Sequence, residues 1–408
     1  MNTFAEPETQ APSPLEHRLR PHFQALAGFD STTALEASAL YARLRGEVAR
    51  VLGAVETGDF RGERPAVARE AIRATAWNVE RGARLEGVAA ALRRQELLRE
   101  SDVLLLTELD YGMARSGNRH VARELAERLR MSYAFAPSYV ALTKGNGLES
   151  GTEGENEQAL HGNAVLARWP IRRAWSVALP NGKDKMRGTE KRLGSQRAVV
   201  ADVEHPSGVF RAVSLHLDAH SSQRHRRRQM RVVLDFIETL SPRLPVLVGG
   251  DWNTSTYNSR HSFYSIVGFW RRVFMGVGHV IENHYLRPER WFERGLFGEL
   301  ERRGYNFRDL NAEGAGTLHY DVKDLAANTN MADWVPRWCF QFIEWALRDH
   351  GGRCSLKLDW FAGRGLKADA RNPPRVVGDL RGPAGEVLSD HDAIVVDFVL
   401  EEVERKAR

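Results

Sequence analysis

The chain has 408 residues, of which 42% are hydrophobic, and a formal net charge of +5. Its two cysteines, Cys339 and Cys354, are too few for a disulfide framework, and no apolar run approaches the roughly 20 residues of a membrane span. Because the first residues also lack the basic and apolar stretches of a secretory signal, we expect a cytoplasmic protein without a transmembrane segment.

The first 70 residues precede the first candidate strand. Residues 1–16 are rich in Pro, Glu and Thr, which predicts a disordered N-terminus. Apolar residues then recur at helical spacing from Leu35 to Leu52, so we expect an N-terminal helical extension over residues 17–70. Packing on the outside of the following domain is the simplest role for this extension, and no protein partner is inferred from it.

Several apolar runs farther along the chain carry polar residues at or near their ends. These residues are Asn78 in the run 74–80, Glu108 in 103–108, His216 in 213–217, Asp251 and Asn253 in 246–253, Asp359 in 356–361, and Asp390 and His391 before 393–398. Apolar runs of this length predict strands that are covered on both faces. Buried carboxylates are costly unless a metal, hydrogen bonds or solvent satisfies them, so we expect one shared site.

The side chains at these positions indicate the kind of ligand that they could bind. Glu, Asp and Asn oxygens without paired cysteines suit Mg²⁺ or Mn²⁺ better than zinc. His216 and His220 lie four residues apart and His225 follows, a spacing that also occurs in metal sites. No matching set of carboxylates or cysteines stands beside them, so we interpret His220 and His225 as loop residues.

Two more helices are predicted by apolar residues at helical spacing. One spans His120 to Leu129, after Glu108, and the other spans Arg226 to Leu240, after His216. Each is expected to be a crossover helix that returns the chain to the next strand.

Taken together, the motifs resemble the endonuclease/exonuclease/phosphatase superfamily, which has the pancreatic-deoxyribonuclease-like fold. They are Trp-Asn-Val at Asn78, Thr-Glu at Glu108, Gly-Asn-Ala at Asn163, Leu-His-Leu at His216, Gly-Asp-Trp-Asn at Asp251 and Asn253, Leu-Asp-Trp at Asp359, and Ser-Asp-His at Asp390 and His391. All occur in the order of the superfamily, over residues 71–400. The resemblance implies an α/β protein with a four-layer α/β sandwich, in which two mixed β-sheets pack face to face with helices outside.

The resemblance also implies a role for each candidate on the metal side of the site. Glu108 would be the principal metal ligand, with Asn78 and Asp390 close to the same cation, Mg²⁺ or Mn²⁺. Asn163 would bind substrate, although Gly-Asn is also a turn signal and could simply lead the chain into a strand.

The remaining residues would carry out the chemistry. By resemblance, Asp251 would orient or deprotonate the attacking water, and Asn253 would hold water or a phosphoryl oxygen. His391, steadied by Asp359, would bind the phosphoryl group. His216 would bind it from the other side or assist the leaving group. A metal and imidazolium donors aimed at the developing charge fit attack on a phosphodiester independently of the family.

One stretch, at about residues 258–350, is longer than compact members of the superfamily need and is treated as an insert. It interleaves aromatic residues such as Trp270, Phe274 and Trp291 with arginines such as Arg271 and Arg290. This pattern could stack bases while neutralising phosphates, or it could lie at a lipid headgroup surface. Alternatively, the aromatic residues could fill a small extra core beside the site.

The expected activity is divalent-metal-dependent hydrolysis of phosphodiester bonds, with nucleic acid as the first choice of substrate. A phospholipid or a small phosphate ester is the alternative, because the superfamily uses one site for several substrate classes. A non-catalytic binding module that uses the same cleft is the third possibility. The net charge and arginine clusters such as residues 224–228 suit a polyanion, although charged helix faces are also common without one.

Overall fold

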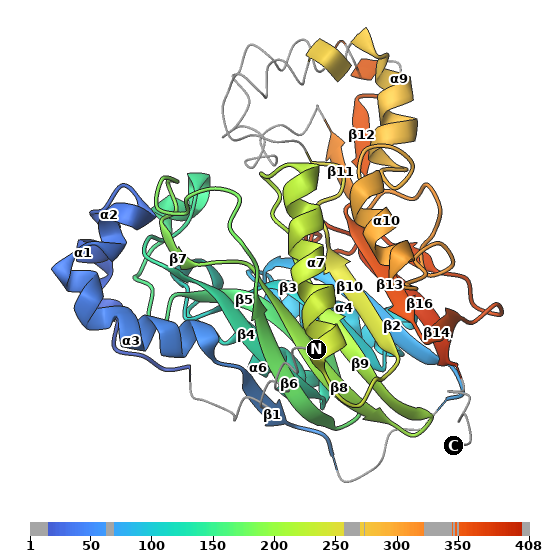
Figure 1. The fold of residues 1–408 in the computed structure, drawn as a ribbon, viewed down its shortest axis with the longest axis horizontal. Coiled ribbons are helices and arrows are strands. Elements are labelled where there is room, and N and C mark those ends of the chain that lie inside the picture. Colours follow the sequence, from blue (N-terminus) through green and yellow to red (C-terminus); the bar gives the residue numbers. More distant parts are fainter. Residues whose placement is uncertain are drawn as a thin grey trace, which may run out of the picture.

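The computed structural model describes residues 15–62, 69–256, 270–272, 274–321, 345, 347–348 and 351–401. Most of the N-terminus predicted to be disordered, Cys339, and parts of the insert, including Phe263, Tyr264 and Phe269, lie outside these ranges. The described residues form two large β-sheets with helices on their outer faces. An arm lies beyond one end of the sheets and comprises the described residues between 270 and 292 together with residues 318–321 and 353–356 (Figure 1).

The first large sheet has nine strands among the described residues, with the order β1-β4-β5-β3-β2-β16-β14; β7 pairs with β4, and β15 pairs with β16. The strands are β1 (Glu56–Asp59), β2 (Ile72–Arg81), β3 (Val103–Tyr111), β4 (Ser132–Ala141), β5 (Leu160–Ala167), β7 (Arg192–Gly194), β14 (Leu366–Ala368), β15 (Arg375–Val377) and β16 (Ala393–Leu400). Because β2 and β3 are parallel and the other pairs are antiparallel, the sheet is mixed.

The second large sheet has the order β13-β10-β9-β8-β6. Its strands are β6 (Ile171–Ala178), β8 (Arg197–His205), β9 (Gly208–Ser214), β10 (Val246–Asp251) and β13 (Asp359–Arg364). It is also mixed, since β9 and β10 are parallel. Two further strands, β11 (Leu318–Asp321) and β12 (Arg353–Leu356), form a small antiparallel sheet of their own.

Alternating side chains explain why the central strands are apolar on both faces. In β3, Leu104 and Leu106 pack under helices, whereas Leu105 faces the second sheet. Helices α3 (Ala39–Gly53), α4 (Leu85–Arg94) and α6 (Val121–Leu129) cover the first sheet, and α7 (Gln223–Thr239) and α10 (Arg294–Arg302) cover the second. The four-layer sandwich of two mixed sheets, predicted from the resemblance, is confirmed.

The connections match the parallel strand pairs. Helix α7 joins β9 to the parallel β10, and α6 joins β3 to β4, as predicted. Helices α4 and α5 (Glu96–Arg99) join the parallel pair β2 and β3, a crossover that the sequence patterns had not indicated. No helix in the described ranges is both long enough and apolar enough to cross a membrane.

One prediction about the segment after His216 was wrong. Ser222 caps helix α7 by accepting a hydrogen bond from the His225 backbone N, so His225 belongs to the first helical turn and not to a loop. Its ring Nε2 lies 2.9 Å from the carbonyl oxygen of Pro180. His220 lies in the turn before the helix. The spacing of His220 and His225 therefore reflects a turn followed by the start of helix α7.

The N-terminal segment contains both helices and a strand. Its helical part comprises α1 (Phe23–Ala27), α2 (Thr32–Glu36) and α3, which lie along one side of the first sheet (Figure 1). Residues 56–59 then pair with β4 as strand β1. The segment predicted as a helical extension thus contains helices α1, α2 and α3 and also adds an edge strand to the large sheet. The domain boundary near residue 70 stays a prediction.

The remaining described helical segments are short. They are η1 (Arg20–His22), η2 (Ala114–Ser116), η3 (Gly147–Gly151), α9 (Val277–Val280) and η4 (Ile281–Tyr285). Residues of α9, η4, β11 and β12 share a small apolar core that includes Ile281, Leu318 and Leu356, separate from the three cores of the sandwich. The arm is thus partly packed on itself.

Candidate active site

The polar residues predicted from the strand ends come from both large sheets. Asn78 and Glu108 lie in the parallel strands β2 and β3, and Asp251 and Asp359 face each other across the β10–β13 pair. Parallel strands end at the same edge of a sheet, which gathers their terminal side chains. Hydrogen bonds from Asn78 to both Glu108 and Asp251 show that the two sheets contribute to one site.

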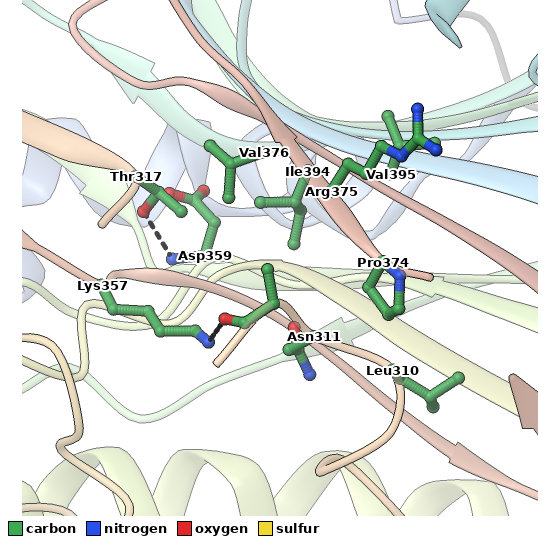
Figure 2. A pocket seen from close by; sticks show the side chains of 11 residues that line it. Leu310, Asn311, Thr317, Lys357, Asp359, Pro374, Arg375, Val376, Ile394 and Val395 are labelled. Carbon is green, nitrogen blue, oxygen red and sulfur yellow. Dashed lines mark hydrogen bonds between the residues drawn. The ribbon is translucent and has the colours of Figure 1, made fainter. Parts of the chain in front are cut away.

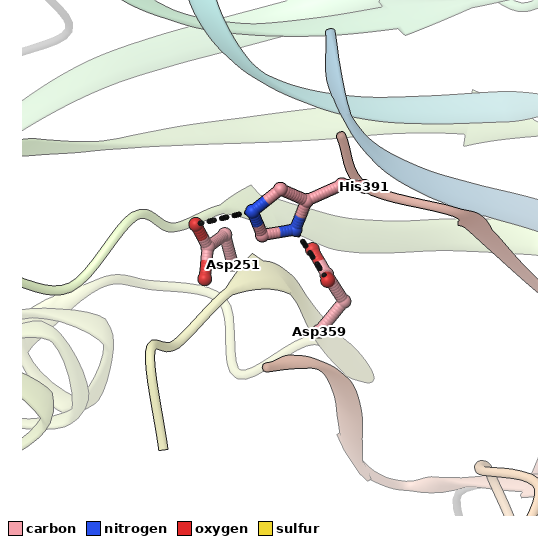
Figure 3. A group of neighbouring side chains, drawn as sticks. All are labelled: Asp251, Asp359 and His391. Atoms are coloured by element: carbon pink, nitrogen blue, oxygen red, sulfur yellow. Dashed lines mark hydrogen bonds and ion pairs between the residues drawn. The ribbon is translucent and has the colours of Figure 1, made fainter. Parts of the chain in front are cut away.

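Two histidines face one buried carboxylate in this site. His391 Nδ1 lies 2.8 Å from Asp359 Oδ2, and its Nε2 lies 3.7 Å from Asp251 Oδ2 (Figure 3). His216 Nε2 lies 3.4 Å from the same Asp251 oxygen. Burial by itself lowers the pKa of His391, but the carboxylates of Asp359 and Asp251 raise it well above its ordinary value. The two neighbouring carboxylates therefore favour the charged form of His391.

Asp251 is poised to exchange a proton near neutral pH. Burial raises its pKa to about 6; the carboxylates of Asp359 and Glu108 act in the same direction, while His391 and His216 oppose it. Burial also lowers the pKa of His216, which favours its neutral ring. The Asp251 side chain is fixed because Oδ1 accepts the Asn253 backbone N–H at 3.0 Å and Oδ2 accepts from Asn78.

Glu108 lies on the other side of the site and keeps its charge. Asn78 Nδ2 donates to its Oε1 at 3.2 Å, and Arg81 Nη1 lies 3.6 Å from its Oε2. Burial would raise the pKa of Glu108, but Arg81 and His216 hold it well below its usual range. Glu108 also has a φ of +57°, a left-handed conformation that is uncommon for residues other than glycine and is concentrated at functional sites.

The two asparagines beside these carboxylates have their side-chain amides engaged. Asn253 has a φ of +51°, and its Nδ2 donates to the Leu217 carbonyl at 3.0 Å. Asn163 Nδ2 donates to the Arg197 carbonyl at 2.7 Å, and its Oδ1 accepts the Glu108 backbone N–H at 3.4 Å. In this structure Asn163 supports the backbone of Glu108. Its predicted contact with substrate stays a prediction.

Asp390 lies at the exposed rim of the site. Burial and the nearby carboxylate of Asp390 raise the pKa of Glu80, a residue that the motif analysis did not single out. The Glu80 backbone N–H donates to Asn78 Oδ1 at 3.0 Å. The Asn78 end of β2 therefore carries a carboxylate, Glu80, two residues beyond Asn78.

A buried network behind Glu108 was also missed from the sequence. His161 Nδ1 lies 2.8 Å from Asp110 Oδ1, and Arg115 Nε donates to Asp110 Oδ2 at 2.8 Å. A sequence signal existed, because Asp110 lies two residues after Glu108, and His161 two residues before Asn163. Period-two spacing along strands β3 and β5 identifies neighbours of the motif residues.

The donor set fits a divalent cation. One ligand atom from each of Asp251, Asp359 and His391 lies within 4.8 Å of the others, but the charged form of His391 has no lone pair to offer a cation. In the described part of the chain, Asp359 Oδ1 and His216 Nδ1 are buried without a hydrogen-bond partner. Since His391 Nδ1 is already engaged by Asp359, the partly exposed carboxylate of Glu108 is the more open ligand, and oxygen donors of this kind suit a hard cation.

Comparison with known families agrees with this arrangement of residues. The sequence model of the Endonuclease/Exonuclease/phosphatase family matches residues 75–308, which is more than half of the chain. The chain belongs to this family. The match includes Asn78, Glu108, Asn163, His216, Asp251 and Asn253 and ends before Asp359 and His391.

Solved structures with similar folds have low sequence identity to the chain. An endonuclease/exonuclease/phosphatase from Beutenbergia cavernae is 17% identical, with 82% of this chain and 72% of that chain covered and a TM-score of 0.47. The human Nocturnin catalytic domain is 16% identical, with 85% and 97% covered and a TM-score of 0.42. D. rerio TDP2, solved with a single-strand DNA product, is 16% identical, with 81% and 99% covered and a TM-score of 0.41. A search of curated proteins found no match.

Proposed function

We propose that this member of the family is a divalent-metal-dependent phosphoesterase that hydrolyses phosphodiester bonds in nucleic acid. The observation that carries the proposal is the buried Asp359–His391 pair, aimed at Asp251 and set opposite the ionised Glu108. The proposed base Asp251, the imidazole of His391 and the candidate cation ligand Glu108 thus belong to one site. This combination suits attack of water on a phosphorus atom.

Asp251 is the proposed general base. A base works best when its pKa lies near the pH of the reaction, and burial brings the pKa of Asp251 to about 6. Its Oδ1 accepts the Asn253 backbone N–H and its Oδ2 accepts from Asn78, and Oδ2, the atom nearest both histidines, is the proposed acceptor of the proton from water. Asn253 itself would hold the water or a phosphoryl oxygen.

The two histidines are proposed to bind the phosphoryl group from different sides. His391 is charged, and Asp359 fixes its Nδ1, so its Nε2–H can donate to an oxygen whose negative charge grows in the transition state. Burial lowers the pKa of His216, which favours a neutral ring that could bind a second phosphoryl oxygen or assist the leaving group. The Asp359 carboxylate also fixes the orientation of the His391 ring.

Glu108, Asn78 and Asp390 are the proposed ligands of Mg²⁺ or Mn²⁺. When bound, such a cation would withdraw charge from the phosphoryl oxygens and the leaving oxygen. The chain prepares for it by keeping Glu108 ionised and by orienting its Oε1 with Asn78. Asn163 contributes by holding the Glu108 backbone.

The choice of nucleic acid rests on the arm. Among the described aromatic residues of the insert, Phe274 is 83% exposed, Trp291 is 68% exposed and Trp270 is also exposed, so these three do not fill a core. Arg271 and Arg290 adjoin Trp270 and Trp291 in the sequence. Exposed rings next to cations can stack bases and neutralise phosphates. The same surface would also suit a lipid interface, which makes phospholipid the alternative substrate.

Hydrolysis assays test the proposal directly. The wild-type protein and the Asp251→Ala variant would be compared on plasmid DNA, single-stranded DNA, RNA, sphingomyelin and inositol phosphates, with Mg²⁺ or Mn²⁺ and with EDTA. Metal-dependent cleavage of nucleic acid by the wild type alone, with affinity that falls steeply as salt rises, is the expected result. Cleavage of only a lipid or a small ester would replace the substrate. No turnover on any substrate would leave a binding module.

A further inference from the structure

The arm that carries the exposed aromatic residues also reaches the catalytic end of the sandwich. Strands β11 and β12 lie beyond the large sheets in Figure 1. At the start of β11, Leu318 forms an isolated bridge with His391, and the Thr317 carbonyl accepts the Asp392 backbone N–H at 2.7 Å. A strand of the insert is thus hydrogen-bonded directly to the segment that bears the catalytic histidine.

The same threonine is bonded to the segment that bears Asp359. Thr317 Oγ1 accepts the backbone N–H of Leu358 at 3.0 Å and of Asp359 at 3.1 Å, and the second of these bonds is drawn in Figure 2. The Thr317 backbone N–H also donates to the Leu356 carbonyl at 2.8 Å. The side chain is fully buried, so these bonds are protected from water.

These bonds join the segment that bears Asp359 to the segment that bears His391. Apolar packing alone would fix the relative position of the two segments less tightly. Asp359 begins β13 in the second sheet, whereas His391 precedes β16 in the first sheet. The sheets meet through an apolar core that includes Phe361 and Ile394, and apolar contacts have no preferred direction. Hydrogen bonds do have a preferred direction, so a group bonded to both segments can set the position of one relative to the other.

We propose that Thr317 is a positioning residue that sets the Asp359–His391 pair in its hydrogen-bonding geometry. This inference rests on the proposed function, in which His391 binds the phosphoryl group. Its basis is that Thr317 Oγ1 accepts the backbone N–H groups of both Leu358 and Asp359, and that the Thr317 carbonyl accepts the backbone N–H of Asp392. The insert then belongs to the catalytic framework as well as to the arm.

A second contact between β11 and the histidine segment allows the role of Thr317 to be separated from simple docking of the strand. His319 Nε2 lies 2.9 Å from Asp392 Oδ2, and its Nδ1 lies 2.7 Å from Ser355 Oγ. This contact is partly exposed and does not reach the backbone of Asp359. His319→Ala should therefore disturb catalysis less than the loss of the Thr317 hydroxyl.

The test compares variants that keep or remove the acceptor at position 317. Thr317→Val keeps the shape and removes the acceptor, and Thr317→Ser keeps the acceptor. We expect kcat to fall about 10- to 100-fold in Thr317→Val, the size of effect caused by small misplacements of catalytic groups. KM and the affinity for Mn²⁺ should stay within about twofold, and Thr317→Ser should restore most of kcat.

A buried threonine elsewhere serves as the matched control. Thr75 is fully buried in β2, and its hydroxyl bonds to Ser101 Oγ at 2.6 Å, so Thr75→Val also loses a buried hydrogen bond. We expect a comparable fall in melting temperature and an unchanged kcat. An equal loss of kcat in Thr75→Val and Thr317→Val would overturn the proposal, as would wild-type kcat in Thr317→Val.

A measurement without substrate separates this inference from the proposed function. Amide hydrogen exchange of Leu358 and Asp359 and the NMR signal of the His391 ring N–H should change in Thr317→Val and return in Thr317→Ser. If the wild type cleaves no phosphoester, the proposed function fails, and unchanged signals would still overturn the role of Thr317. Should Thr317→Val not fold, Thr317→Cys, which keeps a weak acceptor, should give intermediate values; wild-type values would count against the proposal.

Discussion

The two sides of the site are built differently. On the His391 side, the side chains are buried, Asp359 and His391 are 2.8 Å apart, and the His391 backbone N–H donates to Ser389 Oγ at 3.1 Å. On the Glu108 side, the Glu108 side chain is 20% exposed, and the contacts of its carboxylate with Asn78 and Arg81 are 3.2 and 3.6 Å long. One side is closely hydrogen-bonded, and the other leaves room at its oxygens.

This difference matches the role proposed for each side. An imidazole that donates to one phosphoryl oxygen must be aimed, so its ring and backbone are fixed by directional bonds. A carboxylate that binds a cation needs unoccupied lone pairs, and a fully hydrogen-bonded carboxylate would have to give up partners before binding. Each prediction below would break or sharpen this contrast.

The largest effect is expected from removing the aimed groups. His391→Ala or Asp251→Ala should lower kcat by about 10²- to 10⁴-fold, because each removes a group that is proposed to act on a proton or on transition-state charge. Single-turnover hydrolysis of the identified substrate measures this, and far-UV circular dichroism confirms that the variants are folded. Activity retained in both variants would contradict the assignment of this side.

The cation should depend on the other side only. Glu108→Gln should weaken Mn²⁺ or Mg²⁺ binding by at least about 10- to 100-fold, since a neutral amide replaces the charged ligand. Asp359→Asn should leave cation affinity unchanged while lowering kcat. Isothermal titration calorimetry measures the affinity. A loss of cation binding in Asp359→Asn would instead place the cation among Asp251, Asp359 and His391.

The His391 side also contains a buried lysine whose effect on the free energy of unfolding can be measured. Lys357 is 3% exposed, contacts the Trp360 ring, and donates to the Ala312 carbonyl, and burial lowers its pKa from 10.5 to about 8. Between these values the unfolded chain binds more protons than the folded protein, so stability rises with pH. The drop in pKa corresponds to about 3 kcal/mol.

Urea unfolding of the wild type and of Lys357→Met measures this effect. From pH 8 to pH 10.5, the free energy of unfolding of the wild type should rise relative to that of the variant. Lys367 is exposed on β14, so Lys367→Met is the matched control and should show no such change. A constant difference between the wild type and Lys357→Met across this range would mean that Lys357 keeps an ordinary pKa.

The smallest expected effect is a shift in the pH dependence of hydrolysis. Asp251 must be deprotonated to act as a base and its pKa is about 6, so kcat/KM should rise with pH through that value and then level off. More Mg²⁺ should move this rise to lower pH, because a nearby cation favours the carboxylate. Steady-state kinetics from pH 4.5 to 8 at two Mg²⁺ concentrations would show it. A rise that Mg²⁺ does not move would place the cation far from Asp251.

Short-range patterns accounted for much of the fold. The apolar runs 103–108 and 246–251 are strands β3 and β10, because strands between two layers must be apolar on both faces. Strand β1 was missed because its residues, Glu-Thr-Gly-Asp, carry no apolar alternation. Its pairing with β4 is decided by the partner strand. Helix α4 was missed although its apolar residues recur at helical spacing.

The motif residues could be named from the sequence, but their partners were only partly accessible. Asp110 and His161 follow from period-two spacing beside Glu108 and Asn163, so a closer analysis of the strands would have found them. Thr317 could not be found in this way. It bonds to a backbone group 42 residues away, and no local pattern encodes which distant strand will lie next to it.

The sequence by itself determined which side chains are candidates for the site and which segments are buried strands, because both follow from residue type, motif order and local periodicity. Only the tertiary structure decided that Asp251 lies between two histidines, that Arg81 lies beside Glu108, and that the arm is bonded to Asp359 and His391. The physical reason is that charge states and hydrogen bonds depend on distances of a few ångströms between residues far apart in the chain. Those distances are set by how the two sheets and the insert pack together.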